Sequence, residues 1–297
     1  MRSLITSLLV LLLMVLASPA GRTEEPAAVV KVGGRYAVEV VRDVAYHDGP
    51  DADPAKHKLD LYRPKGRNAC PVLFFVHGGA WRSGDKQLYG ALGHTFARNG
   101  IVTVIISYRL SPQVRHPAHI QDVARAFAWT QRNIARYGGR ADQIFAAGHS
   151  AGGHLVALLA TDESYLKTEK LSPRDIKGVI ALSGIYVIQP VRMLRSVFGE
   201  VADVCRRASP LTHVGRDHPP FLIVYAEKDF PTCDKMSEQF CEALQRSRVE
   251  ARSLRVGDRD HISIIVFAAI DETDPVTQAM LEFIAKHSDL KLMPRMQ

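Results

Sequence analysis

The sequence predicts an α/β fold in which helices cover both faces of a mostly parallel sheet. Two apolar runs, residues 72–76 and 101–106, are continuous rather than alternating, which is typical of strands buried on both faces. Segments with helical periodicity separate these and later apolar runs. Each strand is thus followed by a helix long enough to carry the chain back to a parallel neighbour.

The first expected strands are residues 36–46 and 58–62, separated by a turn-rich segment at 47–54. Alternation of apolar and polar residues over 58–62 predicts a half-exposed edge strand. The remaining strands are expected at residues 72–76, 101–106, 143–147, 179–182, 221–226 and 250–256. The expected helices are residues 86–98, 117–137, 152–161, 232–246 and 270–287.

The 297 residues have an ordinary globular composition, with 46% apolar and 23% charged residues. This excludes a disordered chain, a collagen-like repeat and a small disulfide scaffold. The net charge is +7, but the basic residues are scattered along the chain rather than gathered with aromatic residues. That pattern argues against a nucleic-acid-binding protein.

A candidate nucleophile lies where an expected strand turns sharply into a helix. Residues 148–152 match the pattern G-x-S-x-G, with Ser150 at its centre. Glycines on both sides permit the tight turn that lifts the serine hydroxyl clear of the sheet. The alternative is an ordinary glycine-rich turn.

A serine hydroxyl needs a neighbouring base, and in folds of this kind the acid and then the histidine follow the serine in the chain. His261 follows the last expected strand, whereas His287 falls in the closing helix, so we assign the base to His261. Asp229 follows the strand at 221–226 and is the expected acid, with Asp234 and Glu227 as rivals.

The loop at residues 77–81, His-Gly-Gly-Ala-Trp, follows a buried strand and is rich in glycine. Such a loop presents backbone amides to a developing oxyanion, and we expect the donors to be Gly79, Ala80 and Ala151. His77 is expected to anchor the loop. The other histidines have no metal-binding spacing, so we expect no metal and no organic cofactor.

Together, residues 77–81, residues 148–153, Asp229 and His261 resemble an α/β-hydrolase of the carboxylesterase/lipase type. The closer similarity is to the HGGxW branch, which includes feruloyl and acetyl esterase-like proteins and is similar to kynurenine formamidases. The resemblance implies the α/β-hydrolase fold. Two features depart from related patterns: Ala80 replaces a third glycine, and residues 230–233 lack the usual Val-Pro.

These residues predict a serine hydrolase that cleaves a small-molecule carboxylic ester through an acyl-enzyme. One rival is an arylformamidase, and another is a catalytically dead hydrolase fold that only binds. A peptidase is disfavoured because the chain has no room for the large additional domain that such enzymes usually carry.

The connection at residues 184–220 is longer than a strand-to-helix loop requires and is predicted to be a lid-like insertion. It carries apolar residues, among them Met193 and Phe198, that a surface loop does not need. We expect Phe198 to bind substrate from the lid, with Trp81 on the opposite side of the pocket.

The first twenty residues have the pattern of a signal peptide. Arg2 precedes a nearly unbroken apolar stretch at 4–16, and small residues at 17–20 offer a cleavage site. We therefore expect a signal peptide over 1–20, a catalytic domain over 21–297, no membrane span after cleavage, and a secreted or periplasmic protein. The alternative is an uncleaved N-terminal anchor.

An oxidising compartment would permit disulfides among the four cysteines. Cys233 and Cys241 lie eight residues apart in one expected helix, about 12 Å along its axis, which is too far for a disulfide. Cys70 precedes a buried strand and falls at the opposite edge of the sheet from Cys205 and Cys233. The expected pair is Cys205–Cys233.

Overall fold

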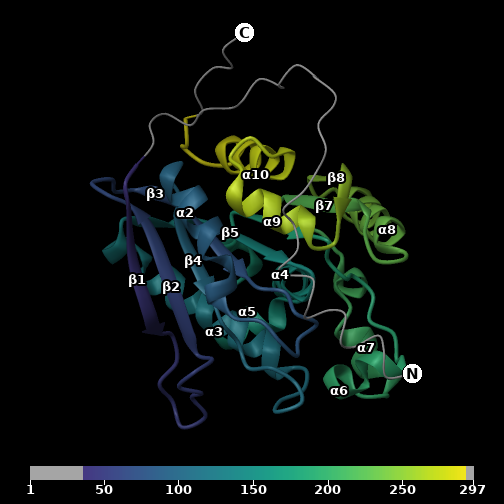
Figure 1. The fold of residues 1–297 in the computed structure, drawn as a ribbon. Coiled ribbons are helices and arrows are strands. Elements are labelled where there is room, and N and C mark those ends of the chain that lie inside the picture. The colour runs from purple at the N-terminus through teal and green to yellow at the C-terminus, as the bar shows by residue number, and fades with distance from the viewer. Residues whose placement is uncertain (1–35, 292–297) are drawn as a thin grey trace, which may run out of the picture.

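Eight strands form one twisted sheet in the order β1-β2-β4-β3-β5-β6-β7-β8 (Figure 1). The computed structural model describes residues 36–291, so the expected signal peptide at 1–20 lies outside the described residues. Strand β2 pairs antiparallel with β1 and β4, and every later pair is parallel. The strands are β1 (Val38–Ala45), β2 (Lys58–Pro64), β3 (Cys70–Val76), β4 (Val102–Ile106), β5 (Gly139–His149), β6 (Gly178–Leu182), β7 (Phe221–Lys228) and β8 (Ala251–Asp260).

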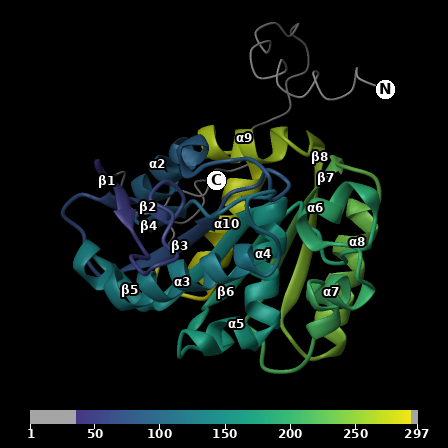
Figure 2. The ribbon, with the colours of Figure 1, turned by 90° about the horizontal axis from the view of Figure 1, so that it is seen from below.

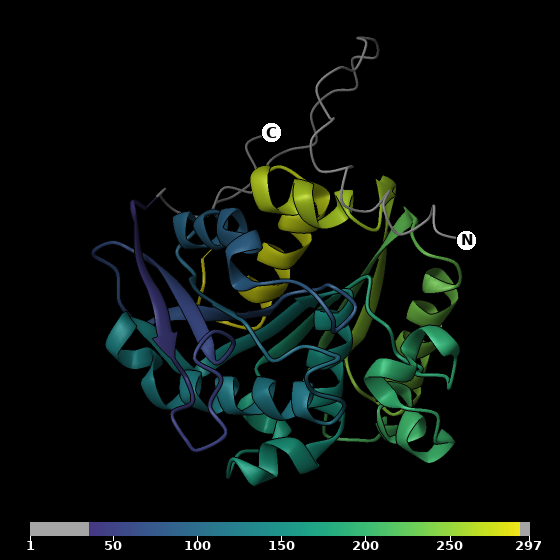
Figure 3. The same cartoon turned by 60° about the horizontal axis from the view of Figure 1, so that its bottom comes forward.

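Helices cover both faces of this sheet (Figure 3). One face packs against α2, α9 and α10, and the other against α3, α4 and α8. The helices are α2 (Gly90–Arg98), α3 (Ala118–Asn133), α4 (Ala151–Thr161), α5 (Glu163–Thr168), α6 (Arg195–Phe198), α7 (Ala202–Arg207), α8 (Cys233–Arg246), α9 (Ser263–Ile270) and α10 (Pro275–Lys286). The predicted α/β fold, with a mostly parallel sheet covered on both faces, is confirmed. Across residues 36–291, no helix is both long and apolar enough to span a bilayer.

The prediction that residues 58–62 form an edge strand is wrong. Strand β2 lies between β1 and β4, and β1 is the edge. The alternation misleads because Asp60 is buried rather than solvated. Its carboxylate accepts the backbone N–H of Asp43 at 2.9 Å and pairs with the buried Lys86 ammonium, also at 2.9 Å.

The closing helix expected at 270–287 is two helices, α9 and α10. Asp274 ends the connection between them, and its side chain accepts the Val276 amide at 2.9 Å as the N-cap of α10. Pro275 follows at the first helical position, where its missing N–H costs nothing. Strand β8 also runs four residues further than predicted, to Asp260.

The insertion at residues 184–220 joins β6 to β7 and contains the short helices α6 and α7. Figure 2 shows α6 and α7 to one side of α4, next to α8. Because it leaves the carboxyl end of β6, the insertion begins at the edge of the sheet where ligands bind in open α/β folds.

Candidate active site

Ser150 sits at the sharp turn between β5 and α4. Its backbone has φ 55° and ψ −117°, and its amide donates to the Leu182 carbonyl at 2.8 Å. A Cβ on Gly148 would lie 2.4 Å from the Gly152 backbone, and one on Gly152 would lie 2.0 Å from the Val76 carbonyl oxygen. The two glycines of the G-x-S-x-G pattern are therefore required by backbone contact. A non-glycine residue at this φ is strained, as is common at functional sites.

Ser150, His261 and Asp229 form one continuous chain of contacts. His261 follows directly on β8, and its Nε2 lies 2.9 Å from Ser150 Oγ. Its Nδ1 lies 2.7 Å from Asp229 Oδ1. The imidazole can therefore accept the serine proton through Nε2 while the carboxylate holds Nδ1–H.

The rival residues lie elsewhere. His287 pairs with Glu250, Glu227 pairs with Arg255, and Asp234 falls in the first turn of α8.

The Asp229 carboxylate is almost fully buried and accepts several hydrogen bonds. Oδ2 accepts from Ser183 Oγ at 2.5 Å and from the Ala226 amide at 3.1 Å, and Oδ1 accepts from the Phe230 amide at 2.9 Å. Burial raises the pKa of this carboxyl, but the hydrogen bonds from His261 and Ser183 outweigh it and hold the pKa at about 2. The carboxylate is thus charged at neutral pH and can stabilise an imidazolium.

Sequence reasoning missed Ser183. The residue follows β6 directly, between the strands that carry Ser150 and Asp229. The signal that could have revealed it is a hydroxyl residue directly after a strand that lies between the strands leading to the nucleophile and the acid.

The loop at residues 77–81 lies against the nucleophile. A Cβ on Gly78 would come within 3.3 Å of Ser150 Cβ. Gly79, Ala80 and Trp81 all have positive φ, and neither the Gly79 nor the Ala80 amide has an acceptor within residues 36–291. Ala151 opens α4, where the first amides have no intrahelical acceptor. The three expected oxyanion donors therefore lie in the segments that meet at Ser150.

His77 anchors this loop, as expected. Its Nδ1–H donates to the Gly78 carbonyl at 2.7 Å, and its ring stacks on Tyr108 with 4.3 Å between centroids. Burial lowers the pKa of His77 to about 4, so the ring is neutral. Tyr89 supports the same turn by accepting the Gly78 amide at 3.0 Å.

Trp81 and Phe198 do not face each other across a pocket. Their ring centroids are 4.9 Å apart, edge to face, and both side chains are buried. The expected placement on opposite sides of a pocket is wrong because the Phe198 ring, in α6, packs directly against the Trp81 indole and leaves no space between them for substrate. Their role in binding substrate stays a prediction. Met193, in the same insertion, is 71% exposed to solvent, and its carbonyl accepts a hydrogen bond from Arg82.

Trp81 is also tied to the insertion through His154. The indole Nε1–H donates to His154 Nδ1 at 3.3 Å, and His154 Nε2–H donates to the Ala208 carbonyl at 2.7 Å. Burial lowers the pKa of His154 to about 3, which keeps this relay neutral. The glycine-rich loop, helix α4 and the insertion are thus connected by polar contacts inside the core.

A model of the BD-FAE family matches residues 59–244, more than half of the chain. The chain belongs to the BD-FAE family. It is 35% identical over 234 residues to esterase LipC of Mycobacterium tuberculosis, in an alignment that covers 71% of this chain and 56% of LipC. It is 28% identical over 248 residues to the kynurenine formamidase of Danio rerio, covering 80% of this chain and 82% of that one.

Among solved structures, esterase B of Lactobacillus rhamnosis matches this BD-FAE protein with a TM-score of 0.71 and 21% identity, over 85% of this chain and 86% of that one. That likeness shows the α/β-hydrolase fold and confirms the expected fold family. This BD-FAE chain spans little more than half the length of the Mycobacterium tuberculosis esterases that it matches.

The predicted Cys205–Cys233 disulfide is wrong, because all four cysteines of this BD-FAE protein are free and buried. Cys233 opens α8, and its Sγ turns along its own helix to lie 4.0 Å from Ser237 Oγ. Cys205 is buried separately in α7. Burial raises the pKa of each thiol.

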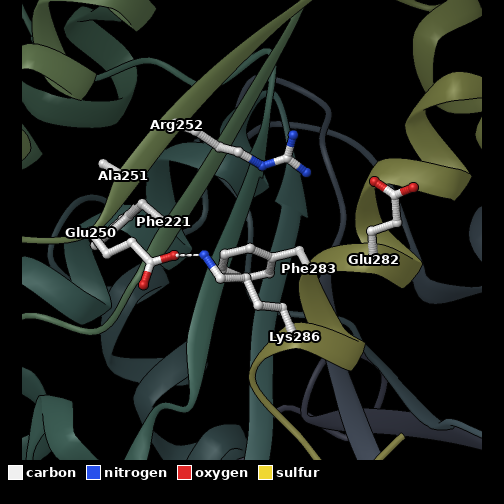
Figure 4. Close-up of a pocket in the computed structure, with 7 residues that line it drawn as sticks. All are labelled: Phe221, Glu250, Ala251, Arg252, Glu282, Phe283 and Lys286. Atoms are coloured by element: carbon white, nitrogen blue, oxygen red, sulfur yellow. Dashed lines mark hydrogen bonds and ion pairs between the residues drawn. The ribbon is translucent and has the colours of Figure 1, made fainter. Parts of the chain in front are cut away.

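A hollow of about 490 Å³ lies beside the first residues of β7 and β8, at the amino ends of the parallel strands (Figure 4). The Lys286 ammonium reaches across it to Glu250 at 2.6 Å, with Phe221 and Phe283 nearby. Because parallel strands carry Ser150 and His261 at their opposite ends, this hollow is not part of the candidate site. Within residues 36–291, no group of His, Cys, Asp and Glu side chains is arranged to hold a metal ion.

Proposed function

We propose that this protein hydrolyses carboxylic esters through an acyl-enzyme on Ser150. The observation that carries the proposal is the chain of contacts from Ser150 Oγ through both nitrogens of His261 to Asp229. A nucleophile, a base and an orienting carboxylate in that order are the parts that acyl transfer needs.

In the first half of the reaction, Ser150 Oγ attacks the ester carbonyl carbon while its proton passes to His261 Nε2. The negative charge that develops on the carbonyl oxygen is met by the amides of Gly79, Ala80 and Ala151. The tetrahedral intermediate then collapses. The bond to the alcohol oxygen breaks, and that oxygen takes the proton from His261 as the alcohol leaves.

In the second half, water replaces the alcohol. His261 Nε2 takes a proton from water as the water oxygen attacks the acyl carbon, and the Ser150 Oγ–carbon bond breaks. The proton returns to Ser150 Oγ, and the carboxylic acid departs. Asp229 stays ionised throughout, because its low pKa keeps the charge on the carboxylate at the moment when His261 is positive.

The proposal is supported by the relatives whose names state esterase activity, LipC among them. Labelling with a fluorophosphonate tests it: Ser150 Oγ forms a bond to phosphorus, fluoride leaves, and the mass shift maps to the peptide containing Ser150. The intact protein should label and should hydrolyse short nitrophenyl esters, and Ser150→Ala should do neither. If the protein binds a ligand without catalysing a reaction, the intact protein should show neither labelling nor ester hydrolysis.

A second candidate is hydrolysis of an N-formyl amide. It is favoured by the match to kynurenine formamidase, which extends over most of both chains. The same attack by Ser150 would apply, with His261 giving its proton to a departing amine. Comparing kcat/KM for formylkynurenine with kcat/KM for nitrophenyl, acetylated-xylan and feruloyl esters separates the two.

We also propose export of the protein, from the pattern at residues 1–20. N-terminal sequencing of protein recovered from the medium or periplasm should begin near residue 21. A chain that keeps Met1 and sediments with membranes would favour the uncleaved anchor instead.

A further inference from the structure

His154 lies on the helix that follows the nucleophile, and its side chain reaches the loop at residues 77–81. It is fully buried in the first turn of α4, and its amide donates to the Ser150 carbonyl at 3.0 Å. Its Nδ1 lies 3.3 Å from the indole Nε1 of Trp81, the residue after Ala80. One side chain therefore joins the two segments that supply the expected oxyanion donors, α4 and the glycine-rich loop.

The partners of His154 allow a single position for its ring proton. The Trp81 indole N–H can only donate, so Nδ1 accepts from it. The Ala208 carbonyl, 2.7 Å from Nε2, can only accept, so Nε2 carries the proton. Burial lowers the pKa of His154 to about 3, so a second proton does not block Nδ1 at neutral pH. The insertion, through Ala208, thus keeps Nδ1 free to hold Trp81.

The loop needs such a restraint because its backbone is strained. Ala80 and Trp81 have φ of 51° and 58°, in the left-handed region that residues with a side chain disfavour. Such a conformation persists only where the surrounding structure holds it. The Trp81 carbonyl accepts the Ser111 amide at 2.8 Å, which fixes the main chain on one side. The indole is held by His154, and Phe198 packs edge to face against both rings.

We propose that His154 is a positioning residue for the oxyanion hole, on which it acts through its bond to Trp81. That bond holds the loop amides of Gly79 and Ala80 at the distance from the Ala151 amide at which the three donors can share one oxygen atom. This rests on the proposed function, in which these amides meet the developing negative charge. Such donors stabilise the transition state only when they already lie where the oxyanion forms.

Two amide substitutions separate the two contacts of His154. In His154→Asn, the side-chain oxygen falls near the position of Nδ1 and can still accept from Trp81, but the donor to Ala208 is lost. In His154→Gln, the longer side chain places its NH2 group near the position of Nε2 and keeps the Ala208 bond, but the acceptor for Trp81 is lost. We expect His154→Gln to lower kcat for a nitrophenyl ester about tenfold or more, with KM changed by less than about threefold. His154→Asn should keep kcat within about threefold of normal.

A thionoester with the same acyl group and alcohol shows which part of the site has changed. Its sulfur is a weaker hydrogen-bond acceptor than oxygen, so the oxyanion donors contribute less to its hydrolysis, whereas Ser150 and His261 are needed for both substrates. A displaced oxyanion hole should therefore lower the ratio of kcat for the ester to kcat for the thionoester, by about tenfold in His154→Gln. A displaced triad would lower both rates and leave this ratio unchanged.

Trp81→Phe removes the same hydrogen bond from its other end. It should lower the ratio to a similar extent, and adding His154→Gln should cost less than about threefold more, because the bond is already broken. The matched control is Thr161→Val, which removes a different buried polar group from α4, a hydroxyl bonded to the Ala157 carbonyl at 2.9 Å. The control should leave kcat and the ratio unchanged.

Thermal unfolding shows which variants are folded, and Trp81→Phe carries the test if His154→Gln does not fold. A normal ratio in either folded variant, or effects of the two substitutions that multiply in the double variant, would overturn the proposal. An intact protein that hydrolyses neither the ester nor the thionoester would instead overturn the proposed function.

Discussion

His149 donates its Nε2–H to the main-chain carbonyl of His261 over 2.8 Å, and the two rings lie 4.8 Å apart. His149 is the variable residue of the G-x-S-x-G pattern, so the residue before the nucleophile holds the backbone of the base. Burial, together with the nearby His261, lowers the pKa of His149 to about 3. The ring is therefore neutral and keeps its proton on Nε2.

Removing this contact should slow the chemical step without weakening substrate binding. We expect His149→Leu to lower kcat by roughly ten- to a hundredfold, with little change in KM, because a small displacement of a catalytic group is costly. His149→Gln keeps an N–H donor and should recover most of the loss. Steady-state kinetics decide the matter, and a folded Leu variant with normal kcat would contradict the assignment.

Ser150 and His261 should behave as one unit. Ser150→Ala should lower kcat by roughly 10⁶-fold, and adding His261→Ala should cost little more, because neither residue works without the other. Retained esterase activity in purified Ser150→Ala protein would show that the nucleophile lies elsewhere.

The hydroxyl of Ser183 should stabilise the folded protein through Asp229. Ser183→Ala removes the 2.5 Å hydrogen bond to a buried carboxylate, and we expect the free energy of unfolding at pH 7 to fall by about 1.5–3 kcal/mol. Chemical denaturation measures this loss. Ser183→Thr, which keeps the hydroxyl, is the control.

The same substitution should change the response to acid. A carboxyl whose pKa is lowered by folding, here from 3.8 to about 2, contributes stability above 3.8 that is lost as the pH falls toward 2. Without the Ser183 hydrogen bond the folded-state pKa of Asp229 rises, so its stabilising contribution at neutral pH becomes smaller. The difference in unfolding free energy between Ser183→Ala and the unaltered protein should therefore narrow between pH 5 and pH 2. A constant difference would contradict this account.

The sequence predicts the parts of this fold that depend on local pattern. Continuous apolar runs mark β3 and β4 because both faces of those strands are covered, and the glycines around Ser150 mark a turn that only they permit. Chain order left two candidates for the base, and the position of His261 just after the last strand, with His287 in the closing helix, was enough to choose His261.

Contacts between distant segments escape such reasoning. Asp60 looks solvent-facing in an alternating run, and only the fold brings Lys86 to it. Ser183 has no motif, and it gains a role because β6 lies between β5 and β7. Phe198 looks like a lid residue until α6 packs it against Trp81.

Phe198 and Met193 should therefore respond differently to truncation. Phe198→Ala removes a buried ring and should lower the free energy of unfolding by about 3–5 kcal/mol. Met193→Ala, at an exposed side chain, should change it by less than about 0.5 kcal/mol while altering the preference among ester chain lengths. Thermal unfolding and an ester series measured on both variants test this pair, and a stability loss in Met193→Ala equal to that in Phe198→Ala would count against it.

The cysteines should not react with thiol reagents while the protein is folded. Cys70, Cys205, Cys233 and Cys241 are all buried, and their raised pKa values keep them as thiols rather than the reactive thiolates. A thiol reagent at pH 8 should therefore find almost no reactive group until denaturant is added, and should then titrate four. If the protein is exported as proposed, the four thiols must also survive an oxidising compartment, so protein recovered after export gives the stricter measurement. Two thiols instead of four under denaturant, with Cys205 and Cys233 joined in the peptide map, would mean that α7 and the start of α8 approach each other more closely than the fold described here allows.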